Sequence, residues 1–487
     1  MIPPITDDDI ATAERMLGGI SFDEDARKFI RTLTPLQVVA CPGSGKTTAL
    51  IGKLLAFSRH LPLPGNCGIC VLTHTNVAVE EITNRLNAAG NTIFGYPNFC
   101  GTFQTFVGHF LGHPGYIEHF GHRPFCVDND VASKELQRRN SPQLCKARYF
   151  LEQRKMTVEE LRFDKQLQVV RPGESAPFVG VCKPTYRAVC DVKTEVLETG
   201  YLFYEDVYVF AERYLDSHPS VADLMRSRFP FVFVDEMQDT DERQLKILTT
   251  LFGEGAVLQM IGDPNQAIYR RSDVGDGCIW QPSSDALTLG KSLRFDQPVA
   301  GIVTRLASVA PLTICGNGRG TTFKPRLIVF PDSCITEVIP TFADIITQLE
   351  INRLPGRRSF KAIGWVTKEN DGGKHTVRSY WPDFGAVQGH RRSEYATLKG
   401  NLSMCTGSSD SNAARLFRRA LATSVARFLR AGNIPAPSGR IFTAATVQTF
   451  LRETNPVLLD ELMTRSAHWC LKARAGHDVS ADVADFL

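Results

Sequence analysis

The chain has 487 residues, of which 43% are hydrophobic and 22% are charged, which is the composition of an ordinary soluble protein. It contains no run of about 18 apolar residues, which excludes a membrane-spanning helix, and a net charge of +3 is too small to indicate a polyanionic partner by itself. The N-terminus lacks the basic head and apolar run of a signal peptide. We therefore expect a cytoplasmic protein with no membrane partner and with about three or four structural units.

The 13 cysteines raise the question of a metal site. Cys67 and Cys70 form the one closely spaced pair, within an apolar run that has no second pair or suitably spaced histidine. Zinc sites need a full ligand set at characteristic spacing. We interpret these two cysteines as small buried residues of a strand.

The first part of the chain alternates between helical and extended patterns. Residues 9–31 have amphipathic helical spacing and lead into the β-branched run LQVVA at 36–40. A helical stretch follows at 49–60, and the apolar run GICVLT at 68–73 precedes another helical stretch at 74–86. Buried strands that alternate with helices predict an α/β fold, with a parallel sheet covered on both faces.

Beyond this point the pattern changes several times. It becomes irregular and rich in basic clusters, which indicates an insertion, and then returns to strands such as FVFVDE at 231–236 and AVLQMIGD at 256–263. A second α/β block has candidate strands RLIVF at 326–330 and KAIGWV at 361–366, and a Ser/Gly-rich linker candidate follows it. The predicted parts are the first lobe in two pieces (1–109 and 200–285), a mainly helical insertion (110–199), an incomplete second lobe (286–400) and a helical C-terminal region (401–487).

The segment ACPGSGKTT at 40–48 has the composition of a phosphate-binding loop. Glycines let backbone N–H groups turn toward phosphate oxygens, Lys46 can reach the β and γ phosphates, and Thr47 can offer its hydroxyl to Mg²⁺. The first position is Ala40 instead of the usual glycine, but the strand before it and the helix after it are the required context. We expect ATP to be bound by Pro42, Gly43, Ser44, Gly45, Lys46, Thr47 and Thr48.

Two carboxylates end the apolar strand at 231–234. Asp235 can hold the Mg²⁺ together with Thr47, and Glu236 can orient and deprotonate the attacking water. Phosphoryl transfer depends on positioning and charge neutralisation, which explains why a carboxylate pair is useful here. The two segments together predict an ATP-hydrolysing site.

Six segments, in order over residues 36–300, resemble the motifs of the UvrD/Rep-type superfamily 1 DNA helicases. They are ACPGSGKTT, VLTHTNVAVEEI, GTFQTFVGHFL, FVFVDEMQDTDERQ, MIGDPNQAIYR and LGKSLRF. The resemblance implies two RecA-like lobes with ATP between them, and single-stranded DNA that crosses both lobes while the protein moves 3′ to 5′.

The resemblance also implies roles for individual residues. Gln266 would sense the γ phosphate, Gln238 and Asp239 would couple hydrolysis to lobe motion, and Arg294 would reach the γ phosphate from the second lobe. Hydroxyl and amide side chains near the DNA backbone can hold phosphates without reading sequence, and an aromatic ring can stack on a base. The implied DNA contacts are Thr73, His74, Thr75, Asn76, Thr102, Gln104 and Tyr269.

The chain departs from the family pattern at several positions. Ala26 stands where the family has an adenine-reading glutamine, Thr48 where it usually has an arginine, and Leu293 where an aromatic residue commonly packs on adenine. His74 replaces an aromatic residue that often stacks on DNA, and Arg271 a common tryptophan. We find no motif V or VI before the chain ends. These departures put strict ATP selectivity and a complete cleft in doubt.

Two functions of different class remain open. The first is an ATP-dependent DNA helicase or translocase in DNA repair or anti-phage defence. The second is an ATP-binding, DNA-sensing regulatory subunit, because the chain also resembles, more loosely, the helicase-like subunit of the Gabija anti-phage system, which works with an OLD-family nuclease. A P-loop kinase or GTPase would leave three of the six motifs without a purpose.

Overall fold

The structure is a computed structural model that describes residues 4–88, 93–267, 280–307, 309, 312–318, 324–353, 359–364, 375–384, 421–426, 429, 436, 442–474, 479 and 482–483. The chain divides into two compact units, Met1–Pro325 (unit 1) and Arg326–Leu487 (unit 2). Each unit is described by itself.

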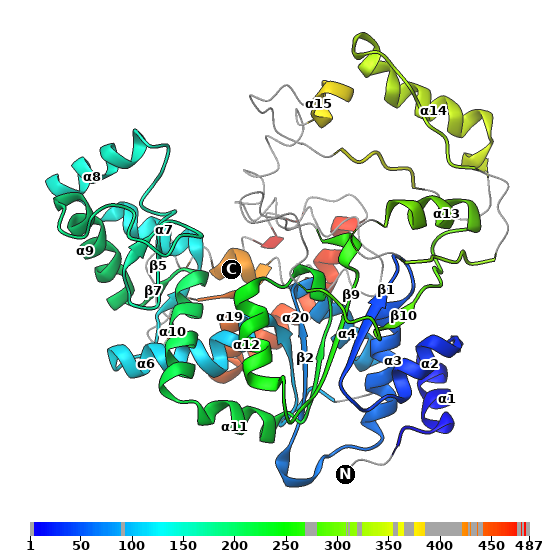
Figure 1. Ribbon diagram of the computed structural model, residues 1–487, viewed down its shortest axis with the longest axis horizontal. Coiled ribbons are helices and arrows are strands. Elements are labelled where there is room, and N and C mark those ends of the chain that lie inside the picture. Colours follow the sequence, from blue (N-terminus) through cyan, green and yellow to red (C-terminus); the bar gives the residue numbers. More distant parts are fainter. Residues whose placement is uncertain are drawn as a thin grey trace. The chain divides into compact units, whose positions relative to one another are not determined.

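Unit 1 is built on a six-stranded sheet whose strand order is β10-β1-β9-β8-β2-β3 (Figure 1). Every strand pair in it is parallel. The strands are β1 (Leu36–Ala40), β2 (Ile69–Thr73), β3 (Phe99–Thr102), β8 (Phe231–Val234), β9 (Val257–Gly262) and β10 (Leu287–Leu289). The predicted α/β fold with a parallel sheet is confirmed.

The remaining elements of unit 1 are mostly helices. Two pairings of two-residue strands, β4 with β7 and β5 with β6, lie outside the main sheet, in or beside the insertion. The helices and short strands are α1 (Asp7–Met16), α2 (Glu24–Arg31), α3 (Lys46–Ser58), η1 (Pro64–Asn66), α4 (Asn76–Ala88), α5 (Phe103–Val107), η2 (Gly108–Gly112), α6 (His113–Phe120), β4 (Cys126–Val127), α7 (Asn129–Arg138), α8 (Pro142–Glu152), β5 (Arg162–Phe163), β6 (Val169–Val170), α9 (Pro184–Glu198), β7 (Tyr201–Leu202), α10 (Tyr204–Ser217), α11 (Ser220–Arg228), η3 (Met237–Asp239), α12 (Glu242–Phe252), η4 (Pro264–Gln266) and α13 (Gln297–Leu306).

The sheet separates two apolar cores because successive strand residues point to opposite faces. In β2, Val71 joins the core formed with α1 to α4, and Leu72 joins the core formed with α5, α10 and α12. Both residues are fully buried. Helices α3 and α12 accordingly lie on opposite faces of the sheet (Figure 1). Burial on both faces explains why the strands read as continuous apolar runs instead of alternating ones.

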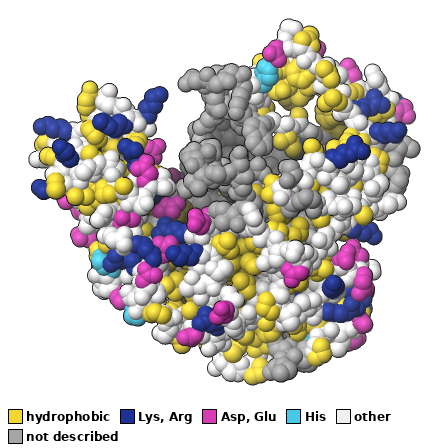
Figure 2. Space-filling model, in the orientation of Figure 1, with side chains coloured by type: hydrophobic (Ala, Val, Ile, Leu, Met, Phe, Trp, Pro, Cys, Tyr) yellow, Lys and Arg dark blue, Asp and Glu magenta, His cyan; other side chains and the backbone are white. Residues whose placement is uncertain are grey.

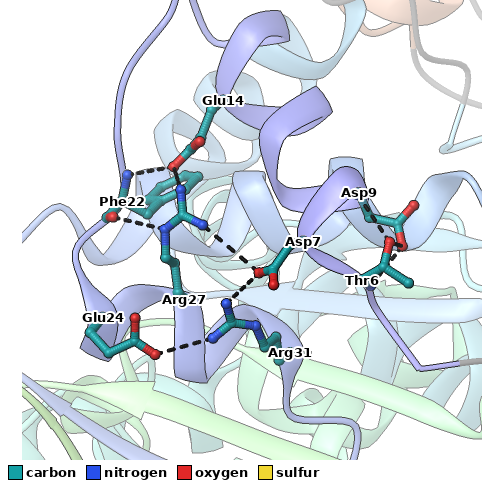
Figure 3. Close-up of polar contacts among 8 residues, drawn as sticks. All are labelled: Thr6, Asp7, Asp9, Glu14, Phe22, Glu24, Arg27 and Arg31. Carbon is teal, nitrogen blue, oxygen red and sulfur yellow. Dashed lines mark hydrogen bonds and ion pairs between the residues drawn. The ribbon is translucent and has the colours of Figure 1, made fainter.

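Helices α1 and α2 are joined by ion pairs beside α3 (Figure 3). Arg27 pairs with Glu14 at 2.7 Å through Nη2 and donates through Nε to the carbonyl of Phe22 at 3.1 Å. Arg31 pairs with Asp7. Partly exposed pairs of this kind contribute little stability each. Their effect here is to fix the orientation of α1 relative to α2.

The insertion carries many Lys and Arg side chains on the face seen in Figure 2. Several of them are paired with acidic neighbours, as Arg139 is with Glu195 at 2.8 Å and Arg138 is with Glu135 at 2.5 Å. In these pairs both partners lie within the insertion, so the positive charge is balanced locally. They do not by themselves mark a phosphate-binding face.

Unit 1 extends past the boundary that the sequence places at residue 286. Strand β10 lies within the predicted second lobe, yet it pairs in parallel with β1, so that Leu289 lies beside Ala40. The predicted strand at 326–330 is wrong, because these residues form neither strand nor helix, and Leu327 and Val329 are 87% and 85% exposed. An apolar run becomes a strand only where a neighbouring strand accepts its backbone hydrogen bonds.

The regular elements among the described residues of unit 2 are helices, and none of these residues forms a strand. Its elements are η5 (Asp332–Glu337), α14 (Val338–Gln348), η6 (Ile351–Arg353), α15 (Val377–Tyr380), α19 (Ala444–Thr454) and α20 (Pro456–Arg474). A small core forms around Phe442 and Val447. Across the described parts of both units, no helix has the length and apolar character that crossing a membrane requires.

Candidate functional site

The predicted phosphate loop connects β1 to α3 as a tight turn. Gly43 and Gly45 adopt φ angles of 79° and 80°, a region that residues with a Cβ rarely adopt. Gly45 is the N-cap of α3, so the helix begins at Lys46 with its N-terminal N–H groups directed at the loop. The Ser44 hydroxyl is buried and has no hydrogen-bond partner among the described residues. A concave turn at a helix N-terminus, with an unpartnered hydroxyl, fits a bound phosphate.

The two carboxylates lie at the same edge of the sheet as the loop. Strand β9 separates β1 from β8, and the parallel register brings the carboxyl ends of all three strands together. The Thr47 hydroxyl lies 3.5 Å from Oδ2 of Asp235, and Nζ of Lys46 pairs with the carboxylate of Glu236. Glu236 has a φ of 59°, which is unusual for a residue other than glycine and costs on the order of 1–3 kcal/mol. Backbone strain at this position is typical of a functional residue.

The two neighbouring carboxyl groups differ in their pKa values. Burial raises the pKa of Asp235 to about 6, although the nearby Lys46 opposes this shift. Burial also acts to raise the pKa of Glu236, but Lys46 and the hydrogen bond from Gln238 more than offset it, and the net shift is downward. Glu236 is therefore ionised across the physiological range, whereas Asp235 takes up a proton near pH 6.

Hydrogen bonds link this pair to the segment after β9. Gln238 donates to Oε2 of Glu236 at 2.5 Å and accepts from the backbone N–H of Asp263 at 3.0 Å. The side chain of Gln266 donates to Oδ2 of Asp263 at 2.7 Å. Asp263 is fully buried and was not selected from the sequence, although it follows β9 as Asp235 follows β8. The segments around 235–238 and 263–266 thus form one connected network.

The expected DNA contacts begin at the end of β2, where Thr73 is buried and His74 contacts neighbouring side chains. Thr73 is fully buried, and its hydroxyl has no partner among the described residues, so its predicted DNA contact gains no support from an accessible surface. The cause is that β2 is a central strand with helices on both faces. His74 bonds Thr240 at 2.9 Å and stacks on Phe103 with ring centroids 6.2 Å apart. Burial lowers the pKa of His74, with Asp241 and Glu236 acting in the opposite direction.

The other expected DNA contacts lie nearer the surface. Thr75 and Asn76 are exposed at the start of α4, where the Thr75 hydroxyl accepts from the N–H of Ala78 at 3.1 Å. Thr102 is mostly buried and caps α5, and the side chain of Gln104 donates to the Tyr204 carbonyl at 3.5 Å. The exposed Thr75 and Asn76 are therefore better placed for DNA than the mostly buried Thr102. Tyr269 and Arg271 lie outside the described residues.

Arg294 lies in unit 1, against the phosphate loop. The backbone N–H of Leu293 donates to the carbonyl of Gly43 at 2.8 Å, and a Cβ added to Gly43 would lie 2.5 Å from Cβ of Arg294. The expectation that Arg294 reaches the site from a second lobe is therefore wrong. The chain returns to the first sheet as β10 and places residue 294 directly beside the loop of its own unit.

Comparison with known proteins decides the family. The sequence pattern of the UvrD/REP helicase N-terminal domain matches residues 23–272, which is just over half of the 487 residues. The chain belongs to the UvrD/REP helicase family. The resemblance to the UvrD/Rep-type helicases is confirmed, and five of the six segments lie within the matched residues, the sixth being at 289–295.

Individual relatives share modest identity with this chain. DNA helicase II of Escherichia coli is 25% identical over 240 residues, which cover 48% of this chain and 32% of that protein. A probable DNA helicase II homolog of Mycoplasma capricolum is 23% identical over 248 residues, covering 48% and 33%. The RecBCD enzyme subunit RecB of Mycolicibacterium smegmatis is 31% identical over 148 residues, covering 30% and 13%. The matched region spans a third or less of these relatives.

One UvrD/REP departure has a structural counterpart in this chain. At position 48, where the family usually has arginine, the hydroxyl of Thr48 accepts a hydrogen bond from Nη1 of Arg85 at 2.9 Å. Arg85 belongs to α4 and also pairs with Glu81 at 2.9 Å. The guanidinium of Arg85 therefore lies beside the start of α3, although position 48 itself carries a threonine and not an arginine. No spacing in the sequence predicts this contact, because 37 residues separate its partners.

Two departures from the family pattern, Ala26 and Leu293, stand at positions where UvrD/REP helicases contact the adenine, the adenine side of the site. Ala26 is mostly buried on α2 and offers only a methyl group where the UvrD/REP pattern has a glutamine. Leu293 is 58% exposed, and its Cδ1 would lie 3.5 Å from a Cβ added to Gly45. An exposed aliphatic side chain next to the loop can pack on a flat base but cannot identify it by hydrogen bonding. The phosphate side of the site is therefore more specific than the base side.

Proposed function

We propose that this chain hydrolyses ATP and uses the energy to move along single-stranded DNA. The observation that carries the proposal is the meeting of Lys46, Thr47, Asp235 and Glu236 at one edge of the parallel sheet, in a chain of the UvrD/REP helicase family. These residues come from two strands that are not neighbours, so the fold itself assembles them.

The chemistry follows from these residues. The N-terminal N–H groups of α3 and Lys46 would bind the phosphates, and Thr47 and Asp235 would hold a Mg²⁺ ion, which would supply neutralisation of the phosphate charge. When Lys46 turns to the phosphates, Glu236 exchanges its ion pair for a water molecule and accepts a proton from it. Gln238 bonds Glu236 and the backbone of Asp263, so it communicates a change at the carboxylate to the segment that carries Gln266.

DNA movement is the finer part of the proposal. The exposed side chains at the start of α4, Thr75 and Asn76, together with Gln104, would hold the DNA backbone without reading its sequence. Direction 3′ to 5′ is proposed from the family resemblance, and the pathway is either DNA repair or anti-phage defence. Two of the similar proteins, from Salmonella typhimurium and Escherichia coli, are named DNA helicase II, which supports a DNA motor.

A second candidate is a regulatory subunit that binds ATP, senses DNA and controls a nuclease. One matched relative is named as a subunit of the RecBCD enzyme, which favours membership of a larger assembly. The aliphatic and methyl side chains on the adenine side also favour modest nucleotide selectivity. An OLD-family nuclease, as in a Gabija-type system, is the partner proposed for this case.

The two candidates are separated by measuring ATP hydrolysis with and without single-stranded DNA. Glu236→Gln keeps the shape of the side chain and removes the base, so we expect turnover to fall by about 100-fold or more while nucleotide affinity remains. Glu254→Gln, at an exposed turn after α12, is the matched control and should behave as the unmodified protein does.

DNA-stimulated turnover that is lost only in Glu236→Gln would support the motor. ATP binding without turnover under any DNA condition would contradict it and favour the regulatory subunit. No ATP binding at all would contradict both candidates.

A further inference from the structure

A buried serine joins the phosphate loop to the segment that carries Arg294. Ser292 is fully buried, and its hydroxyl donates to the carbonyl of Pro42 at 2.8 Å. The same hydroxyl oxygen accepts from the backbone N–H groups of Arg294 and Phe295, at 3.3 Å each. A hydroxyl has one donor and two acceptor positions, so all of its capacity is used here.

The contacts of Ser292 fix the backbone on both sides. On the loop side, the N–H of Leu293 donates to the carbonyl of Gly43 at 2.8 Å. On the other side, the N–H of Ser292 donates to the carbonyl of Cys315 at 2.9 Å, and the N–H of Cys315 donates to the carbonyl of Gly290 at 2.9 Å. Ser292 therefore lies in a turn, residues 292–295, that is hydrogen-bonded to the phosphate loop on one side and to Cys315 on the other.

The side chain carried by this turn is the one that needs accurate placement. Arg294 is exposed, and its guanidinium has no hydrogen-bond or ion-pair partner among the described residues. Its Cβ, by contrast, lies so close to Gly43 that a methyl group there would not fit. The backbone of Arg294 is thus held firmly, while its charged end remains available for a ligand. Such an arrangement suits a cation that acts on a phosphate bound in the loop.

We propose that Ser292 is a positioning residue, whose hydroxyl holds the turn that presents Arg294 to the γ phosphate of a nucleotide bound in the loop at 42–48. The proposal rests on the proposed ATP site and deepens it. It assigns a role to a residue that has no chemistry of its own in the reaction. It also implies that the loop at 42–48 and the backbone of Arg294 form one rigid segment within unit 1. The position of the Arg294 backbone would then not depend on nucleotide binding.

The test is a double-mutant cycle on kcat. We expect Ser292→Ala to lower kcat by about 10-fold or more, and Arg294→Ala by at least as much, because arginines in this role are worth several orders of magnitude. If Ser292 acts through Arg294, the double variant has the kcat of Arg294→Ala alone. A double variant whose kcat falls by the product of the two single effects would overturn the proposal, as would an unchanged kcat in Ser292→Ala.

Further variants guard against simple misfolding. Ser292→Cys has nearly the same shape but bonds weakly through sulfur, so we expect an intermediate loss of kcat that also disappears in the Arg294→Ala background. A kcat for Ser292→Cys equal to that of the unmodified protein would contradict the proposal. Ser284→Ala, in the exposed stretch before β10, is the matched control and should leave kcat unchanged.

Nucleotide binding distinguishes failure of this proposal from failure of the proposed hydrolysis. Displacement of a fluorescent ADP by ATP measures the preference for ATP, which depends on contacts to the γ phosphate. If the unmodified protein shows this preference but no turnover, hydrolysis fails as a function while the role of Ser292 is still tested. An equal loss of ATP preference in Ser292→Ala and Arg294→Ala then supports the role, and a preserved preference in Ser292→Ala refutes it.

Discussion

At the carboxyl ends of the strands, the proposed nucleotide contacts after β1 and β8 (the nucleotide edge) and the proposed DNA contacts after β2 and β3 (the DNA edge) use polar residues in different ways. At the nucleotide edge, functional side chains contact one another, as Lys46 does with Glu236 and Thr47 with Asp235. At the DNA edge, Thr102 and Thr75 bond backbone N–H groups of their own helices. Side chains that contact one another are therefore stronger evidence of a functional site than residues whose types merely match the motifs of a family. A hydroxyl that caps a helix already has a structural reason to be present.

The largest expected effect concerns the nucleotide edge. Gly43→Ala combines an unfavourable φ of 79° with a Cβ only 2.5 Å from that of Arg294, so we expect nucleotide affinity to fall by about 10-fold or more and the free energy of unfolding by about 2–3 kcal/mol. Gly18 has a φ of 85° with nothing within 4 Å of an added Cβ, so Gly18→Ala is the control for backbone strain alone, at about 1 kcal/mol. Nucleotide titration and chemical denaturation measure both. If Gly43→Ala and Gly18→Ala changed the free energy of unfolding and the nucleotide affinity equally, the close contact between residue 43 and Arg294 would contribute to neither.

The second effect is the dependence of Mg²⁺ binding on pH. The folded pKa of Asp235 is raised to about 6, so its carboxylate is mostly ionised at pH 7 and mostly protonated at pH 5. Because only the carboxylate binds Mg²⁺ well, affinity should be full above pH 7 and fall about 10-fold by pH 5. Titration of Mg²⁺ in the presence of bound nucleotide checks this prediction. Asp235→Asn should bind Mg²⁺ weakly at every pH, and a pH step that persists in this variant would assign the effect to another group.

The smallest effect belongs to the DNA edge and separates exposed from buried positions. Thr73→Val replaces a buried, unpartnered hydroxyl by a methyl group of similar size, so we expect the affinity for single-stranded DNA to stay within about 2-fold. Asn76→Ala removes an exposed amide and should weaken binding by several-fold, roughly independently of DNA sequence. Fluorescence anisotropy at fixed salt compares the two. A larger loss in Thr73→Val than in Asn76→Ala would reverse the assignment of this edge.

Local patterns were sufficient for the main elements of unit 1. The run LQVVA before a glycine-rich turn predicted β1, the loop and the helix α3, although α3 begins at Lys46 and not at residue 49, because apolar strands and glycine turns depend on nearby residues. The strand expected at 326–330 failed for the opposite reason. Whether an apolar run becomes a strand depends on a partner elsewhere in the chain, and no local pattern records it.

The sequence by itself predicted the parallel α/β fold and the UvrD/REP family, and it singled out the candidate phosphate loop and carboxylate pair. Only the tertiary structure decided how these residues meet, since β1 and β8 lie on either side of β9 and their register brings both strand ends to one edge. It also placed Arg294 in unit 1, showed the guanidinium of Arg85 beside Thr48, and gave Ser292 its three partners. These contacts join residues far apart in the chain, and a serine or an arginine carries no sign of such a partner until the fold brings it into reach.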